Sequence, residues 1–182
     1  METAGLCGEL EKVILPLPFK GIERFYDISG LLANPVLFSR TVDALCSLVI
    51  EEKPDYICAL DSRGFIIGSP IAYSLKIPLI MIRKGGKLPG VCNKVEFGKE
   101  YDSTDTFEIQ AGAIREGSTV VVIDDVVATG GSLKGAFDLI KSQGADKIRA
   151  FCLLDLELAG SRELLKENEI QVASLLTKRN CS

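Results

Sequence analysis

Residues 120–132 (VVVIDDVVATGGS) combine the residue types that a site for a phosphorylated sugar requires. An apolar stretch runs into the acid pair Asp124 and Asp125, and a glycine turn follows and opens a predicted helix. The turn consists of Ala128, Thr129, Gly130, Gly131 and Ser132. Consecutive backbone N–H groups in such a turn, together with the positive end of a helix, bind an anion such as a phosphate. Glycine lets the backbone approach that anion closely, and the two hydroxyl groups add donors.

Asp124 and Asp125 would repel a phosphate that they faced directly. We therefore interpret them as acceptors for the vicinal hydroxyls of a sugar whose phosphate lies in the turn. Competing phosphate motifs fail: residues 130–135 have the glycine spacing of a Walker A loop without its Lys-Ser/Thr, and G-x-G-x-x-G does not occur. The alternative is an ordinary helix start after a strand that ends in acids. The coincidence of both features after a buried strand favours a site.

Cationic side chains follow two other predicted strands. Arg63 lies in the turn Asp61-Ser62-Arg63-Gly64, where its guanidinium could hold a polyanionic leaving group. Arg83, Lys84 and Lys87 lie on a strand end and in the loop after it. A solvated charged loop is the ordinary reading of such a run. On a chain with a net charge of −4, however, a local basic cluster indicates a small anionic ligand.

Composition excludes several classes of chemistry and partner. The chain has no histidine, so a His-based triad, HExxH zinc chemistry and an imidazole base are all excluded. The acidic balance argues against nucleic acid as a partner, and no run of 18 apolar residues predicts a membrane span. Six scattered cysteines without a C-x-x-C pair argue against a disulfide framework or zinc site and favour a cytoplasmic location.

Alternating apolar runs and amphipathic stretches predict the elements that must position these residues. We expect strands over residues 56–60, 79–82, 119–123, 148–154 and 172–176, and helices over residues 65–75, 132–142 and 161–168. This alternation predicts an α/β fold, a single domain over residues 1–182 with a mostly parallel sheet covered on both faces. In such sheets ligands bind beyond the carboxyl ends of the strands, where the acid pair and the cations fall.

Two segments do not fit the repeat, and four blocks resemble a known family. Residues 13–35 carry several prolines, and residues 84–104 are glycine-rich and charged with little periodicity. The blocks are LDSRGFIIGSPIA at 60–72, IRKGGKLPG at 82–90, EY at 100–101, and the acid pair with its turn. Together they resemble the type I phosphoribosyltransferases, and among these the adenine phosphoribosyltransferases. The resemblance spans most of residues 54–160. It implies a twisted sheet flanked by helices, a small N-terminal hood over residues 1–35 and a mobile lid over residues 84–104.

The resemblance also implies an activity and roles for individual residues. Members of the family make AMP and pyrophosphate from adenine and PRPP in purine salvage. Asp124 and Asp125 correspond to the ribose-binding acids and residues 128–132 to the loop that holds the 5-phosphate. Arg63, Arg83, Lys84 and Lys87 correspond to further PRPP-binding residues, chiefly at its pyrophosphate. Magnesium is expected to arrive with PRPP rather than in a cage of protein ligands.

Further roles carried by the resemblance concern catalysis, assembly and the base. Glu100 corresponds to the residue that manages the proton of the base, and it joins Arg63 and Asp125 as a catalytic residue. Members of the family are homodimers in which an arginine at the position of Arg83 reaches the neighbouring subunit's pyrophosphate site. A cis peptide often precedes the arginine of the 61–64 turn, which makes the Asp61–Ser62 bond the candidate.

The identity of the base is the part of the prediction with open alternatives. The hood residues Arg24, Phe25 and Tyr26, together with Arg63, are expected to contact the base, with Phe25 stacking on the purine. This segment has one residue more than the family pattern between its glycine and its aromatic-x-Asp. A transferase for hypoxanthine or guanine is therefore one alternative. A non-catalytic PRPP-sensing regulator on the same fold is the other.

Overall fold

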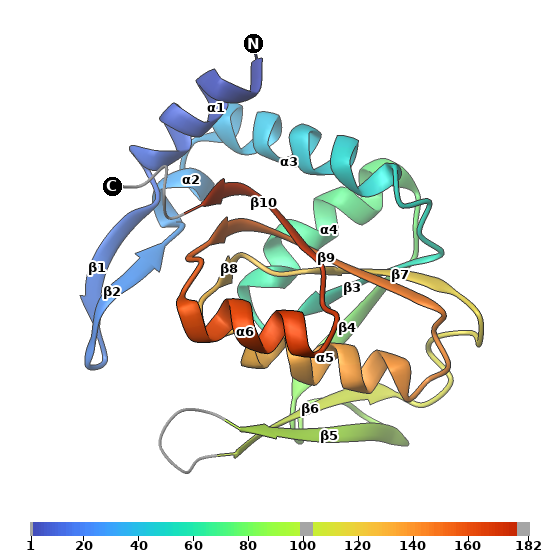
Figure 1. The fold of residues 1–182 in the computed structure, drawn as a ribbon. Helices are drawn as coiled ribbons and strands as arrows, with labels where there is room; N and C mark the ends of the chain where they lie inside the picture. The colour runs from blue at the N-terminus through green and yellow to red at the C-terminus, as the bar shows by residue number, and fades with distance from the viewer. Residues whose placement is uncertain (1, 99–103, 178–182) are drawn as a thin grey trace.

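A central sheet organises the computed structural model, which describes residues 2–98 and 104–177 (Figure 1). Its strands lie in the order β10-β9-β7-β3-β4-β6-β5. Their bounds are β3 Tyr56–Leu60, β4 Leu79–Lys84, β5 Cys92–Gly98, β6 Thr104–Gln110, β7 Thr119–Ile123, β9 Lys147–Asp155 and β10 Val172–Thr177. The run from β10 to β4 is parallel, whereas β6 pairs antiparallel with both β4 and β5. A short strand, β8 (Val126–Val127), adds to β9.

Helices cover both faces of the sheet and divide the core into two clusters. On one face lie α1 (Glu2–Glu11), α2 (Ser29–Leu32), α3 (Pro35–Ile50) and α4 (Arg63–Leu75), and on the other α5 (Gly131–Lys141) and α6 (Ala159–Glu167). Successive strand residues point to opposite faces. In β7, Val121 and Ile123 therefore pack toward α4, and Val120 and Val122 toward α5. The predicted α/β class with a mostly parallel sheet is confirmed.

The predicted strands and helices agree with the structure to within two residues at each end, but α1, α3 and both hairpins were not predicted. The signals for α3 are present in the sequence. Asn34 accepts a hydrogen bond from the backbone N–H of Leu37 at 3.0 Å, and Pro35 occupies the first turn. Leu37, Leu45 and Val49 then recur at helical spacing and are buried.

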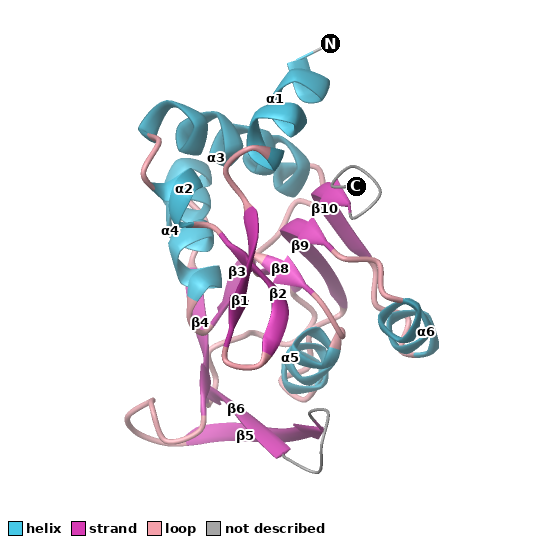
Figure 2. Cartoon of the chain, turned by 90° about the vertical axis from the view of Figure 1, so that its left-hand side faces the viewer, coloured by secondary structure: helices cyan, strands magenta, loops and turns pink. Residues whose placement is uncertain are grey.

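An antiparallel hairpin stands at the edge of the sheet where the parallel strands end. It is formed by β1 (Leu15–Phe19) and β2 (Ile22–Asp27). Figure 1 shows it on the side of the strand arrowheads, and Figure 2, from that side, shows it in front of the strand ends. Every residue of β1 is exposed, so the hairpin meets the core through β2, where Tyr26 is buried. Its position is compatible with the predicted hood, which stays a prediction.

A second hairpin, β5–β6, forms the last two strands in the sheet order and lies against α5 (Figure 1). Gly135 of α5 faces the ring of Phe97, and a methyl group at Gly135 would come within 2.6 Å of that ring. Phe97 in turn packs on Phe107 of β6, with ring centroids 4.5 Å apart. Residues 92–98, in the segment whose sequence has little periodicity, form β5, because their apolar side chains pack on α5. The predicted lid stays a prediction.

No helix within the described ranges is both long enough and apolar enough to cross a membrane.

Candidate active site at the strand ends

The carboxyl ends of three neighbouring strands, β7, β3 and β4, bring the predicted site segments together. Ala59 of β3 pairs with Ile123 of β7, and Leu60 pairs with Ile82 of β4. The residues that follow these pairs, Asp124, Asp61 and Arg83, therefore lie along one edge of the sheet. This arrangement follows from parallel pairing, because equivalent ends of parallel strands meet at the same edge.

The acid pair at the end of β7 is held firmly by the backbone. Asp125 is 4% exposed, and its backbone N–H donates to Asp124 Oδ1 at 2.9 Å. The Asp125 carbonyl oxygen accepts hydrogen bonds from the N–H groups of Leu153 and Leu154, at 3.0 and 3.1 Å. These bonds tie the loop after β7 to the neighbouring strand β9. The two carboxyl groups are thus presented in a defined geometry.

Burial opposes ionisation of both acids. It raises the pKa of Asp124 well above its ordinary value, and the adjacent Asp125 carboxylate raises that pKa further. Burial raises the pKa of Asp125 as well, although the Arg63 guanidinium works in the opposite direction. The pair therefore presents carboxyl oxygens at a fixed position beside Arg63, where they can accept hydrogen bonds from sugar hydroxyls.

The turn after the acid pair has the geometry of an anion-binding helix start. Gly130 adopts a φ of +83° and precedes α5, and a side chain there would come within 3.2 Å of Ser161 Oγ. No side chain caps this end of α5. The N–H groups of its first turn are therefore available to an anion. Thr129 and Ser132 are exposed beside them and add hydroxyl donors.

Arg63, the first residue of α4, links the acid pair to the N-terminal hairpin. Its Nε lies 2.8 Å from Asp125 Oδ2 as an ion pair, without the alignment of a hydrogen bond. Its Nη1 donates to the backbone oxygen of Tyr26 at 2.8 Å, and the guanidinium carbon lies 4.5 Å from the centre of the Phe25 ring. The Asp61–Ser62 peptide before Arg63 is cis, as predicted.

Gly64 allows the start of α4 to approach the end of β7. A methyl group at this position would come within 2.7 Å of the Ile123 carbonyl oxygen and 3.2 Å of Asp124 Oδ1. A contact of 2.7 Å with a backbone atom cannot be relieved by a rotamer change, because the atom belongs to the central strand. The close approach lets Arg63 reach Asp125.

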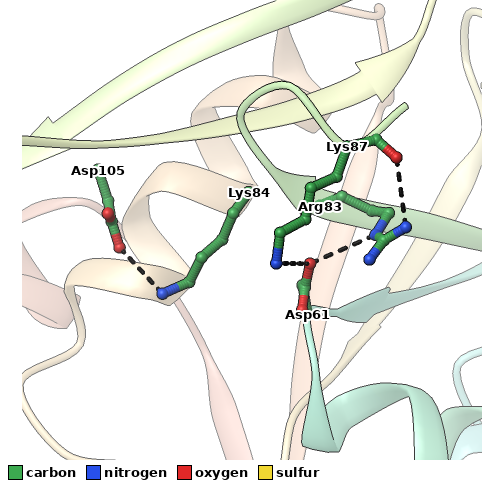
Figure 3. A network of polar contacts seen from close by, with 5 residues as sticks. All are labelled: Asp61, Arg83, Lys84, Lys87 and Asp105. Carbon is green, nitrogen blue, oxygen red and sulfur yellow. Dashed lines mark hydrogen bonds and ion pairs between the residues drawn. The ribbon is translucent and has the colours of Figure 1, made fainter. Parts of the chain in front are cut away.

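A buried carboxylate, Asp61, gathers two of the predicted cations (Figure 3). Arg83 Nε and Lys87 Nζ each lie 3.3 Å from Asp61 Oδ2, and Arg83 Nη1 donates to the Lys87 carbonyl oxygen at 3.2 Å. Burial tends to raise the pKa of Asp61, but the contacts with Lys87 and Arg83 and a backbone N–H together lower it. Lys84 points elsewhere, with its Nζ 3.4 Å from Asp105 Oδ2. The structure thus joins Arg83 and Lys87 and separates Lys84 from them.

The predicted base-contacting residues occupy different environments on β2. Phe25 is half-buried, with the Phe19 ring 5.1 Å away on the other strand of the hairpin. The Tyr26 side chain is buried in the core, so its backbone oxygen is the group that faces Arg63. Arg24 is exposed, with its guanidinium carbon 6.0 Å from the Tyr26 ring. Phe25 is the one of the three whose ring lies beside the guanidinium of the strand-end site.

Two features of the site were not predicted or lie out of view. Asp61 was not among the predicted site residues, although an acid directly after a buried strand is the same signal that identified Asp124. Glu100 lies outside the described residues. Cavities of about 450 Å³ between α1, α3 and β10 and of about 580 Å³ beside Gly85 lie apart from Arg63 and Asp125.

Comparison with known proteins defines the class first. Residues 37–176 match the family model of the phosphoribosyl transferase domain. An adenine phosphoribosyltransferase of Rhodospirillum rubrum is 41% identical over 142 residues, which cover 78% of this chain and 82% of the relative. The fold, the strand-end site and these matches together define a phosphoribosyltransferase.

Solved structures narrow the class. The adenine phosphoribosyltransferase of Saccharomyces cerevisiae, complexed with an imino-altritol bisphosphate and adenine, superposes with a TM-score of 0.80 at 36% identity, covering 95% of this chain and 99% of that one. The Trypanosoma brucei enzyme, in complex with AMP, pyrophosphate and ribose-5-phosphate, gives 0.85 at 27% identity, covering 97% and 81%. This chain belongs to the adenine phosphoribosyltransferase family.

Proposed function

We propose that the chain transfers the 5-phosphoribosyl group of PRPP to adenine and releases AMP and pyrophosphate, a reaction of purine salvage. The observation that carries the proposal is the meeting of three groups at adjacent strand ends: the acid pair with its glycine turn, Arg63, and the cations on Asp61. The relatives described above with adenine, AMP and pyrophosphate support this choice of substrates and products.

Each group suits one part of PRPP. The turn at residues 128–132 would hold the 5-phosphate through backbone N–H groups and the start of α5. Asp124 and Asp125 would bind the ribose hydroxyls next to it. Arg63 and Lys87 would bind the pyrophosphate, for which they would exchange their present carboxylate partners, Asp125 and Asp61. Arg83 would leave Asp61 in the same way and bind the pyrophosphate in the partner's site. Lys84, directed to Asp105, would contribute charge at a greater distance.

The reaction forms one bond and breaks another at C1 of the ribose. Adenine N9 supplies the electron pair for the new C–N bond, and the C–O bond to pyrophosphate breaks with its electrons leaving on the pyrophosphate. Positive charge develops on the ribose, so the site must position the partners, stabilise the leaving anion and exclude water. Glu100 would accept the N9 proton, and residues 84–104 would close over the site as a lid.

Magnesium would enter with PRPP as part of the substrate. The pyrophosphate and hydroxyl oxygens of PRPP, together with waters, would supply the oxygen ligands that Mg²⁺ prefers. When bound, the ion would neutralise charge on the pyrophosphate. The chain's own contribution is to hold the ribose hydroxyls and the phosphates in register around it.

The proposal is tested by turnover of labelled PRPP with adenine, hypoxanthine and guanine in competition. We expect adenine to be consumed first, with Phe25 stacking on the base as its half-buried ring allows. Asp125→Asn and Arg63→Ala should each lower kcat/KM by at least about a hundredfold, since each removes a charged side chain that would contact the reacting substrate. Both variants should keep the wild-type circular dichroism spectrum.

The outcomes that contradict the proposal are specific. Wild-type-like turnover in both variants would remove the mechanism. Preference for hypoxanthine or guanine would reassign the base. Binding of PRPP without release of pyrophosphate would make the chain a sensor of PRPP rather than a transferase.

We further propose a homodimer in which Arg83 reaches the partner's site. Four exposed apolar side chains support an interface on the α4 face of the sheet edge: Ile66, Tyr73, Leu79 and Met81. Leu79 lies next to α4, with Cδ1 3.6 Å from the Cβ position at Gly68, so strand and helix residues share one surface. Large apolar side chains gathered on one face commonly mark a contact with another chain.

We also propose a cytoplasmic location. The cysteines at positions 7, 46, 58, 92 and 152 are free thiols. Free thiols persist in a reducing compartment, which supports the proposal. Fractionation of cells that express the chain is the direct measurement.

A further inference from the structure

Glu108, on β6, is a buried carboxylate outside the site described above. Its side chain is 2% exposed, whereas acidic side chains are almost never fully buried unless they are paired. Removing a carboxylate from water is unfavourable unless a cation and hydrogen-bond donors compensate. The groups that compensate at Glu108 therefore indicate what the residue holds in place.

Lys94 is the first of these groups. It pairs with Glu108 directly across the β5–β6 hairpin, and its Nζ lies 2.6 Å from Glu108 Oε1. Lys94 lowers the pKa of Glu108 most strongly, and the backbone N–H groups of Gly86 and Lys87 lower it further. Glu108 is therefore ionised at neutral pH and offers those N–H groups a charged acceptor.

The N–H groups belong to the turn at residues 85–87, which is closely fitted to β6. The Gly85 N–H donates to the Thr106 carbonyl oxygen at 2.9 Å, and a methyl group at Gly85 would lie 3.3 Å from Thr106 Cβ and 3.9 Å from Glu108 Oε1. Gly86 has a φ of +77°, which glycine adopts without strain. The conformation of the turn thus depends on contacts with β6.

This turn carries Lys87, one of the two cations that meet at Asp61. Arg83 at the end of β4 pairs in register with Glu108, and its Nη1 donates to the carbonyl oxygen of Lys87. Lys87 Nζ and Arg83 Nε then converge on Asp61 Oδ2 (Figure 3). A displacement of the turn by about 1 Å would separate Lys87 from the place where the pyrophosphate is expected.

We propose that Glu108 is a positioning residue for the pyrophosphate side of the site: its carboxylate fixes the conformation of the 85–87 turn, so that Lys87 reaches Asp61 and the leaving group. The inference rests on the proposed function for its substrate and deepens it. Glu108 touches no part of the predicted substrate. It acts through the backbone of Gly86 and Lys87.

Glu108→Gln tests the proposal, with Glu96→Gln as the matched control. Glu96 is an exposed carboxylate two residues from Lys94 on β5, opposite Thr106. Glu108→Gln should raise the KM for PRPP about tenfold, as loss of a charged hydrogen bond implies, with kcat and the KM for adenine within about twofold of wild type. Glu96→Gln should change none of the three. Equal losses in kcat and in both KM values would indicate a general structural role and overturn the proposal.

A double-mutant cycle with Lys87→Met measures whether Glu108 acts through Lys87. The double variant should have the KM for PRPP of Lys87→Met alone, because the turn no longer carries the side chain that Glu108 positions. Additive effects would overturn the proposal. If Glu108→Gln does not fold, Lys94→Met replaces it, since the exposed Lys94 can be removed without opening the core; it should raise the same KM by a smaller factor, and an unchanged KM would overturn the proposal.

Amide hydrogen exchange separates this inference from the proposed function. Peptides that cover residues 84–91 should exchange faster in Glu108→Gln than in wild type or Glu96→Gln, whether or not the protein turns over PRPP. Unchanged exchange in this segment would overturn the proposal even in an active enzyme. A wild-type protein that is inactive with PRPP would instead contradict the proposed function, while faster exchange would still support the hold of Glu108 on the turn.

Discussion

Two carboxyl groups share the buried end of β7, and the surrounding protein disfavours charging both. Burial and mutual repulsion raise the pKa of Asp124, and burial raises that of Asp125 against the opposing effect of Arg63. An acid whose pKa is raised by folding destabilises the folded chain at any pH above the unfolded pKa, because the folded state must then either keep a proton that the unfolded state releases or hold a buried charge. Groups arranged in this way are typical of functional sites.

Asp124→Asn should therefore stabilise the folded chain near neutral pH while it abolishes turnover. The amide keeps an oxygen for the N–H of Asp125 and removes the like charge. We expect a gain of about 1 kcal/mol at pH 7.5, or about 2–4 °C in Tm for a chain of this size. The gain should shrink toward pH 4, where about half of the unfolded carboxyl groups are themselves protonated. Thermal unfolding at both pH values measures it.

Asp43→Asn, at an exposed position on α3, is the control for a change in net charge. It should shift Tm by less than about 1 °C at either pH. A loss of stability in Asp124→Asn at pH 7.5, or an equal gain at both pH values, would contradict the assignment of a raised pKa.

At the scale of secondary-structure elements, glycines set how closely helices approach the sheet that carries the site. Gly64 brings α4 against the end of β7, and Gly135 brings α5 against Phe97 of the β5–β6 hairpin. The two glycines therefore lie on helices that cover opposite faces of the sheet. Each can be tested by adding one methyl group.

Gly64→Ala should destabilise the chain by about 1–3 kcal/mol and reduce activity, because its methyl group would overlap the Ile123 carbonyl and push Arg63 away from Asp125. Gly160→Ala, in α6, is the matched control, since nothing lies within 4 Å of its Cβ position. That substitution should be neutral or stabilising, because alanine favours the helix. Chemical denaturation and kcat/KM distinguish the two. Equal behaviour of both variants would refute the role given to Gly64.

Gly135→Ala should also destabilise the chain by about 1–3 kcal/mol, here by displacing the Phe97 ring and loosening the hairpin from α5. In the double variant Gly135→Ala/Phe97→Leu, the leucine side chain leaves room for the new methyl group and should recover part of that loss. Phe97→Leu alone is destabilising. Urea unfolding of the three variants measures the coupling. Strictly additive losses would show that the two positions do not press on each other.

At the scale of the whole molecule, the proposed homodimer determines which chain supplies Arg83 to each active site. Within the single chain, Arg83 lies against its own Asp61, whereas the proposed dimer would direct it to the partner. The exposed apolar residues on α4 and β4 supply a surface for that dimer. Cis and trans use of Arg83 predict different results when two inactive variants are mixed.

Co-expression of Arg83→Ala and Asp125→Asn chains should restore about a quarter of wild-type activity if Arg83 acts in trans. Half of the dimers would be mixed, and in each of these one of the two sites would hold both intact residues. If Arg83 acts in cis, every site in the mixed dimer keeps one defect and activity stays at the level of the variants. Light scattering provides the mass, and a monomer at assay concentration would contradict the dimer itself.

Much of the fold was predictable because its signals are local. Short apolar runs that end in a turn predict the parallel strands, and the strand β7 was predicted over the residues that form it. The helix α3 and the strand β5 were not predicted. The strand β5 is held in place by the packing of its Phe97 ring against Gly135 of α5, a contact between distant segments of the chain. Strand order and the packing of hairpins depend on contacts between distant segments, which periodicity does not contain.

The acid pair and the glycine turn after it were predictable from the residues alone, because turn chemistry and side-chain periodicity act within about ten residues. The family followed from the resemblance of four sequence blocks. Which partners those residues meet follows from the assembled tertiary structure. Arg63 contacts Tyr26, which lies 37 positions away in the chain. Asp61 forms ion pairs with Arg83 and Lys87, whereas Lys84 pairs with Asp105. Glu108 lies beside the turn at residues 85–87. These pairings follow from strand register and from close approach at glycines, which arise only when the sheet is assembled.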